Sequence, residues 1–70
     1  MHTSTYNTSR ILRLPEVIKR TGWKRSSIYA HEKAGQFPKR VKLGLRSVGW
    51  LESEIDAWIE NRIKTSRGNQ

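Results

Sequence analysis

Cysteine is absent from this sequence of 70 residues, and histidine occurs only twice, as His2 and His31. Without cysteine the chain can form no disulfide bond, no thiolate zinc site and no thiol nucleophile. Two histidines are too few for a metal centre unless carboxylates join them, so we expect neither a metal ion nor another cofactor. Apolar runs fall well short of the ~18 residues that a membrane span requires. We therefore expect a protein of the reducing cytoplasm without a membrane segment.

Acidic residues are scarce as well. Six Asp and Glu face fourteen Lys and Arg, which gives a net charge of +8 and a pI near 10.7. The imbalance is uneven, because residues 1–50 carry eleven bases and two acids, whereas residues 51–70 carry three bases and four acids. A strongly basic part beside an acidic segment is typical of a face that binds a polyanion, next to a separate structural element. A merely basic surface is the alternative.

A chain of this length allows one domain with a thin hydrophobic core. Residues 1–10 are mostly polar and show no periodicity, so we expect a disordered N-terminal tail there. Residues 65–70 are polar too and are expected to form a disordered C-terminal tail. The domain itself is expected over residues 11–64, beginning with a short extended segment at Ile11 and Leu12.

Two short helices are predicted in the first half of the domain. The first covers residues 14–22, where Pro15 suits the first helical turn and Gly22 suits the left-handed residue that ends a helix. The second covers residues 25–34 and is ended by Gly35. Two helices joined by a turn of about three residues that contains glycine are typical of a helix-turn-helix.

A hairpin and a third helix are predicted to follow. Apolar residues alternate with basic or small ones on both sides of Gly44, which predicts a two-stranded β-hairpin with its tip at residues 44–46. The third helix is expected from about Leu51 or Ser53 to Lys64, with one apolar stripe. The predicted fold is therefore α+β, mainly α, in the form of a minimal winged helix. It consists of the helix-turn-helix, the two-stranded hairpin as the wing, and the C-terminal helix.

Several specific motifs are spread over residues 11–63. They are Leu14-Pro15-Glu16-Val17 with Thr21-Gly22, Ser26-Ser27-Ile28-Tyr29, Gly35-Gln36-Phe37-Pro38, Val41-Lys42-Leu43-Gly44, and Val48-Gly49-Trp50-Leu51-Glu52-Ser53-Glu54-Ile55-Asp56-Ala57-Trp58-Ile59. In these motifs the sequence resembles the AlpA family of prophage-encoded regulators. That family is related to phage excisionases and to the MerR-like winged-helix DNA-binding domains.

The resemblance implies a DNA-binding protein of a prophage or genomic island, associated with the nucleoid in the cytoplasm. Members of the family activate transcription of an integrase gene, promote excision as recombination directionality factors, or do both. The implied partner is double-stranded DNA at a promoter or at attachment-site repeats, and a phage-type integrase is a second candidate partner. This sequence departs from the family pattern at Lys24, Ala30, His31 and Glu32. The family's target preference is therefore not transferred to it.

The second helix is the candidate for reading base edges in the major groove. If Ile28 faces the core, a spacing of ~100° per residue turns Ser26 and Lys33 away from the core. The residues expected to contact bases are Arg25, Ser26, Ser27 and Lys33. For the two serines, the ordinary polarity of a helix start is the alternative.

Contacts with the DNA backbone are assigned to basic or hydroxyl-bearing residues on or beside the helices, where they would neutralise or bind phosphates. These residues are Lys19, Arg20, Lys24 and Tyr29. The wing contributes a second basic set, which consists of Lys39, Arg40, Lys42 and Arg46. Arg46 lies nearest to the tip and is the best candidate for the minor groove. The alternatives are a half-buried position for Tyr29 and solvated surface charges for the wing residues.

The aromatic residues and the acids have structural explanations. A core this small needs large aromatic side chains, so a core position is favoured over base stacking for Trp23, Trp50, Trp58 and Phe37. Acid–base catalysis would need a nucleophile or metal ligand near the acids of the third helix, and the neighbouring sequence contains none. A charged solvent-facing surface is therefore expected there, and we do not expect an enzyme.

Two other functions remain possible at this stage. The acidic residues 52–60 could form a protein-interaction module that binds an integrase. The basic residues could also bind nucleic acid without specificity, although RNA recognition is disfavoured because the pattern predicts no sheet with exposed aromatics. The sequence shows no evident dimerisation helix, so we expect monomers that bind DNA singly or assemble on it cooperatively.

Overall fold

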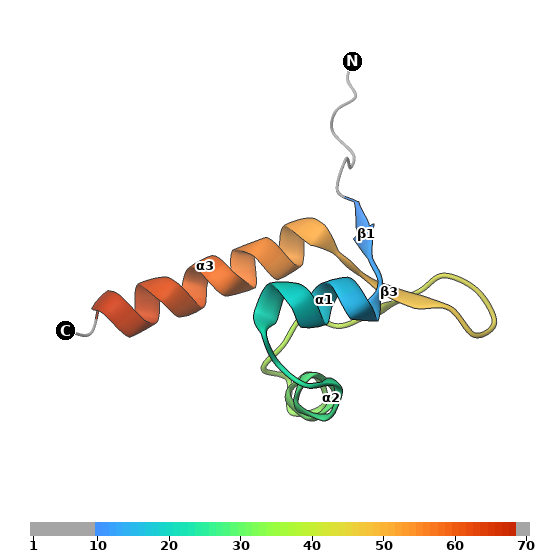
Figure 1. Ribbon diagram of the computed structural model, residues 1–70, viewed down its shortest axis with the longest axis horizontal. Coiled ribbons are helices and arrows are strands. Elements are labelled where there is room, and N and C mark those ends of the chain that lie inside the picture. Colours follow the sequence, from blue (N-terminus) through green and yellow to red (C-terminus); the bar gives the residue numbers. More distant parts are fainter. Residues whose placement is uncertain (1–9, 69–70) are drawn as a thin grey trace, which may run out of the picture.

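The computed structural model describes residues 10–68, which form three helices and a small three-stranded sheet (Figure 1). Along the chain the elements are β1 (Ile11–Leu12), α1 (Leu14–Thr21), α2 (Arg25–Lys33), β2 (Val41–Lys42), β3 (Val48–Leu51) and α3 (Glu52–Gly68). This order confirms the predicted mainly helical α+β fold with a winged-helix-like arrangement. The division into a domain and two tails stays a prediction, and residues 1–9 and 69–70 lie outside the described residues.

The sheet is antiparallel and has the order β1-β3-β2. Leu12 of β1 is paired with Trp50 of β3, and Val41 of β2 is paired with Gly49. The pair β2 and β3, with the loop of residues 43–47 between them, is the predicted hairpin, and we call it the wing. β1 turns the expected two-stranded hairpin into a three-stranded sheet, because two residues carry too little alternation to predict strand pairing.

Two glycines set the turns around α1 and α2. Gly22 ends α1 with φ at 75°, and its N–H donates to the carbonyl of Ile18 at 2.8 Å. Gly35 follows α2 with φ at 79°. Both lie in the left-handed region that glycine adopts at little cost, as predicted for Gly22. Because α2 starts directly after Lys24, only residues 22–24 separate the two helices.

The core takes side chains from the sheet, from every helix and from the segment after α2. Its buried members are Leu12, Val17, Ile28, Phe37, Trp50 and Ile55. Trp23 and Trp58 pack against this core, with their rings edge to face and 5.0 Å between centroids. The indole N–H of Trp50 donates to the carbonyl of Pro38 at 3.1 Å, which satisfies its polar atom inside the core. Trp50 is therefore part of the core, as predicted, whereas Trp23 and Trp58 are half-buried against it.

α3 is longer than the sequence pattern predicts. The expected end at Lys64 was wrong, because the helix continues to Gly68. The polar residues beyond Lys64 favour a tail, but polarity alone does not end a helix when no proline intervenes. Residues 60–68 are all exposed, and Figure 1 shows this half of α3 projecting beyond the other elements.

A single arginine ties α1 to α3. The guanidinium of Arg20 donates to Glu52 at 2.6 Å and to Asp56 at 2.8 Å. The hydrogen bond with Glu52, together with the negative charges of both carboxylates, raises the pKa of Arg20 above its ordinary value. This pairing counts against the phosphate contact predicted for Arg20, and we leave Arg20 out of the proposed DNA interface.

Replacing Gly49 with alanine is expected to destabilise the fold. A Cβ at this position would overlap Cγ2 of Ile11 and lie 3.1 Å from the carbonyl oxygen of Leu12. Overpacking of this kind costs about 1–3 kcal/mol, and each kcal/mol lowers the melting temperature of so small a domain by about 4–8 °C. Thermal unfolding measures the effect. Gly68→Ala is the control, because within the described chain no atom lies within 4 Å of its added Cβ; equal losses for both variants would contradict the prediction.

Arg20→Ala is expected to lower the melting temperature, because it leaves Glu52 and Asp56 of α3 without their shared cation. Added salt screens exposed ion pairs, so the difference from the unmodified protein should shrink as the salt concentration rises. Thermal unfolding at low and high salt measures both effects. The neighbouring exposed residue supplies the control: if Lys19→Ala lowers the melting temperature as much, the ion pairs are not the cause.

Candidate nucleic-acid interface

The outer side of α2 is free of core packing. Ile28 is buried on the inner side, whereas Arg25, Ser26 and Lys33 are exposed, as the helical spacing predicts. Ser27, the fourth residue expected to contact bases, is half-buried, and its carbonyl is hydrogen-bonded to Nδ1 of His31 at 2.9 Å. Three of the four predicted base-reading side chains therefore lie on one accessible helix surface.

Glu32 is a buried carboxylate on the side of α2 that faces the segment leading into the wing. It is 7% exposed, and its Oε2 accepts a hydrogen bond from the backbone N–H of Arg40 at 2.8 Å. Nε of the same arginine lies 3.4 Å from that oxygen. Because Glu32 holds both the backbone and the side chain of Arg40, it fixes α2 against the segment that leads into the wing. Sequence reasoning missed this role, although Glu32 is the only acid in the stretch of residues 17–51.

A basic pocket surrounds this contact. Its lining consists of Tyr29, Glu32, Lys33, Lys39 and Arg40. The guanidinium of Arg40 lies over the ring of Tyr29, 5.0 Å from its centroid. Tyr29 is half-buried, which is the position expected for it as the alternative to a phosphate contact. Lys33 and Lys39 are exposed here and bring their charges from α2 and from the segment before β2 to one place.

Two of the four residues assigned to the wing lie outside it. Lys39 and Arg40 precede β2 and line the pocket beside α2, because the short strand begins only at Val41. Lys42 lies in β2, and Arg46 lies in the loop between the strands; both are exposed. The predicted basic set is therefore divided into a pair next to α2 and a pair on the wing.

The wing loop is a short closed turn. The N–H groups of Leu43 and Gly44 both donate to the carbonyl of Ser47, at 2.7 and 3.3 Å. These bonds close the loop at its base and leave Leu45 and Arg46 at its outer end, both exposed. In Figure 1 the hairpin extends away from the three helices, so its tip is free to contact another molecule.

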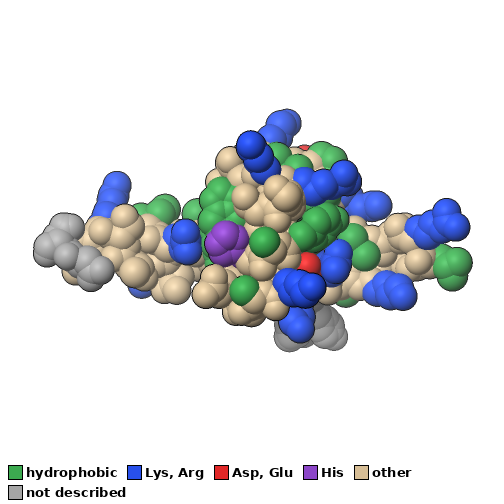
Figure 2. Space-filling model, turned by 90° about the horizontal axis from the view of Figure 1, so that it is seen from below, with side chains coloured by type: hydrophobic (Ala, Val, Ile, Leu, Met, Phe, Trp, Pro, Cys, Tyr) green, Lys and Arg blue, Asp and Glu red, His purple; other side chains and the backbone are tan. Residues whose placement is uncertain are grey.

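α2 and the wing face the same way. Figure 2 views the molecule from the side on which α2 lies and shows Lys and Arg side chains around this helix and out to the tip of the wing. Acidic side chains are almost absent from this view. A duplex lying against this face would meet the exposed helix surface and the basic wing together, which is the arrangement that the sequence pattern predicts.

The acidic residues of α3 are partly neutralised by arginines of the same chain. Glu52 and Asp56 pair with Arg20, and Arg10 lies 3.9 Å from Glu52. Two of the four acids of α3 are therefore already engaged in ion pairs. These ion pairs reduce the negative charge that α3 could offer to an integrase, which is the alternative hypothesis for this surface.

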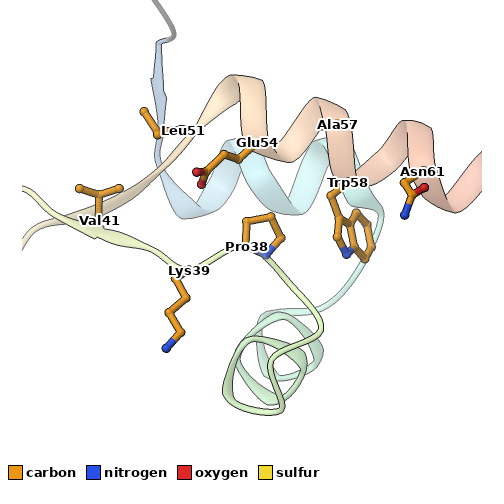
Figure 3. A pocket seen from close by; sticks show the side chains of 8 residues that line it. All are labelled: Pro38, Lys39, Val41, Leu51, Glu54, Ala57, Trp58 and Asn61. Carbon is orange, nitrogen blue, oxygen red and sulfur yellow. The ribbon is translucent and has the colours of Figure 1, made fainter. Parts of the chain in front are cut away.

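A second hollow lies between α3 and the segment before β2 (Figure 3). It is lined by Pro38, Lys39, Val41, Leu51, Glu54, Ala57, Trp58 and Asn61. Lys39 points away from α3 (Figure 3). Residues 10–68 contain no group of three side chains suited to hold a metal ion. None of the helices in that part of the chain is both long and apolar enough to cross a membrane.

Comparison with known proteins identifies the family of this chain and two relatives. The family described as prophage CP4-57 regulatory protein (AlpA) matches residues 10–63. The "DNA-binding transcriptional activator AlpA" of Escherichia coli (strain K12) is 48% identical over 61 residues, which cover 79% of this chain and 87% of that relative. The "Uncharacterized protein ORF88" of Enterobacteria phage P4 is 48% identical over 54 residues, which cover 77% of this chain and 61% of the phage protein.

These relatives confirm the resemblance that the sequence motifs indicate, and the relative with a stated function is a DNA-binding regulator, not an enzyme. The match extends from Arg10, just before β1, to Ile63 in the projecting half of α3. It therefore includes α2, the wing and most of α3. The chain belongs to the AlpA family of prophage regulatory proteins.

Proposed function

We propose that this chain binds specific double-stranded DNA sites of a prophage or genomic island and regulates transcription from them. The observation that carries the proposal is the common face of α2 and the basic wing (Figure 2). The function of the Escherichia coli relative, a DNA-binding transcriptional activator, supports it. This role places the protein in the cytoplasm, at the nucleoid.

In the proposed complex α2 enters the major groove. Arg25 and Lys33 present long donors to base edges, and such contacts discriminate between base pairs. Ser26 and Ala30 are small and exposed between them, so the helix backbone can come close to the groove floor. Ser27 contributes less than its neighbours because it is half-buried.

The remaining bases hold the helix in this position. Lys42 and Arg46 bring the wing to the neighbouring stretch of backbone, and Lys39 approaches from the basic pocket. Lys19 and Lys24 are exposed near the junction of α1 and α2, where they can reach a flanking phosphate. Arg40 has a positioning role, because Glu32 and the ring of Tyr29 hold its guanidinium. Phosphate contacts of this kind make the affinity strongly dependent on salt.

The biological outcome has two forms within this proposal. Bound at a promoter, the protein activates a neighbouring integrase gene; bound at attachment-site repeats, it directs an integrase toward excision. Monomers that bind adjacent repeats cooperatively serve either outcome. A promoter fusion and an excision assay, each with and without the protein, separate the two.

The basic test is a gel-shift titration with DNA that flanks the gene and with a nearby attachment site. The proposal predicts binding to one of these at concentrations that leave random duplex unbound, since specific sites exceed non-specific ones by roughly 10³-fold or more. Structured RNA is the second competitor. Equal affinity for random duplex, or stronger binding to RNA, would contradict the proposal.

The wing bases are expected to act independently of sequence. Lys42→Ala or Arg46→Ala should weaken binding to specific and random duplexes alike and reduce the slope of log affinity against log salt by about 1 for each phosphate that the variant no longer neutralises. Titrations at several salt concentrations measure the slope. Lys64→Ala removes an exposed base from α3 instead and should leave the slope unchanged.

The bases of α2 are expected to act on sequence preference. Arg25→Ala or Lys33→Ala should lower the ratio of specific to random affinity by about tenfold or more, which is the discrimination that one good base contact provides. Competition titrations with both duplexes measure the ratio. If all four variants weakened both duplexes equally, the division between base-reading helix and phosphate-binding wing would be refuted.

A further inference from the structure

Leu45 is unusually exposed for a leucine. Its relative exposure is 88%, whereas the other exposed large hydrophobic residues of the described chain range from 37% to 48%. Among those, Leu43 remains close to the sheet, since its Cδ1 would lie 3.2 Å from a Cβ added to Gly49. Leu45 therefore contributes little to the core, and its place in the fold does not explain an apolar side chain.

The loop presents Leu45 outward. The two hydrogen bonds to the carbonyl of Ser47 close the loop behind it, and Gly44 beside it adds no side-chain bulk. Arg46 follows directly, and Lys42 lies on the strand that leads into the loop. Seen from the side of α2, the end of the wing carries Lys and Arg side chains next to a hydrophobic one (Figure 2). The tip is thus a narrow apolar projection with flanking positive charges.

We infer that Leu45 is a wedge that enters the minor groove beside the wing and bends the DNA. This inference rests on the proposed function, because it needs α2 in the major groove and the wing over the adjacent strand. Apolar side chains that press between neighbouring base pairs unstack them partly and kink the duplex. Arg46 and Lys42 would hold phosphates on either side while Leu45 contacts the bases. The tip of the wing would then both bind the DNA backbone and bend the duplex.

DNA fits this tip better than a second protein does. A stable protein interface buries about 800 Å² on each partner. One leucine in the short loop after a two-residue strand offers far less. Another copy also carries a net charge of +8, which disfavours its approach to the flanking cations. The phosphates beside a minor groove attract the same cations.

The test compares Leu45→Ala with the unmodified protein on the duplex that the gel shift selects. Donor and acceptor dyes at the two ends of the duplex report the bend, and titration reports the affinity. We expect Leu45→Ala to reduce the bend and to weaken binding by about tenfold, as expected when an apolar side chain that is buried in the complex is removed. The melting temperature of the free protein should not change, since Leu45 is outside the core. Ile63→Ala, which removes an exposed hydrophobic side chain from α3, should change neither bend nor affinity.

A second duplex carries a mismatch at the base step under the wing, which makes that step easier to unstack. The unmodified protein should bind this duplex more tightly than the matched one, and Leu45→Ala should lose most of that gain. An unchanged bend with unchanged affinity would overturn the wedge. So would a variant that loses only cooperative binding to two adjacent sites, because Leu45 would then contact a second copy. An unmodified protein without site preference contradicts the proposed function instead, and the bend measured on random duplex still decides whether Leu45 distorts DNA.

Discussion

Trp50 lies where the sheet, α2 and the segment before β2 meet, and the arrangement of the DNA-facing elements depends on its burial. It is fully buried, it is paired with Leu12 across the sheet, and its indole N–H is bonded to the carbonyl of Pro38. Its ring also lies 6.5 Å from that of Tyr29 on α2. In a domain with only six buried hydrophobic residues among those described, one large aromatic side chain supplies much of the area that is removed from water. The wing and the helix therefore keep their common face because both are packed against the same indole.

The positions of the few acids leave the positive charge concentrated on the face of α2 and the wing. Glu32 is buried beneath the basic pocket and binds Arg40, while Glu52 and Asp56 bind Arg20 at the other side of the molecule. Each of these acids holds two elements together, and each neutralises an arginine that would otherwise add to the general positive charge. The cations that remain on the face of α2 and the wing are the ones that a phosphate backbone can use.

Local features of this fold can be predicted from the sequence because they depend on neighbouring residues. Gly22 and Gly35 mark the helix ends through their own conformational freedom, and the spacing around Ile28 is enough to identify the exposed side of α2. The roles of Arg20 and Glu32 depend on contacts between elements. Arg20 meets carboxylates 32 and 36 positions away, and a pattern that covers only one helix at a time cannot identify such partners.

β3 and α3 are continuous: the strand ends at Leu51, the helix begins at Glu52, and the N–H of Glu52 donates to the carbonyl of Arg10 beside it. With no linker between them, the direction of β3 also sets the direction in which α3 leaves the sheet. The ion pairs of Arg20 with Glu52 and Asp56 hold the first turns of α3 against α1, so its exposed half keeps one orientation relative to the wing. When the wing lies against a duplex, the far end of α3 therefore points in a direction that the fold has already set.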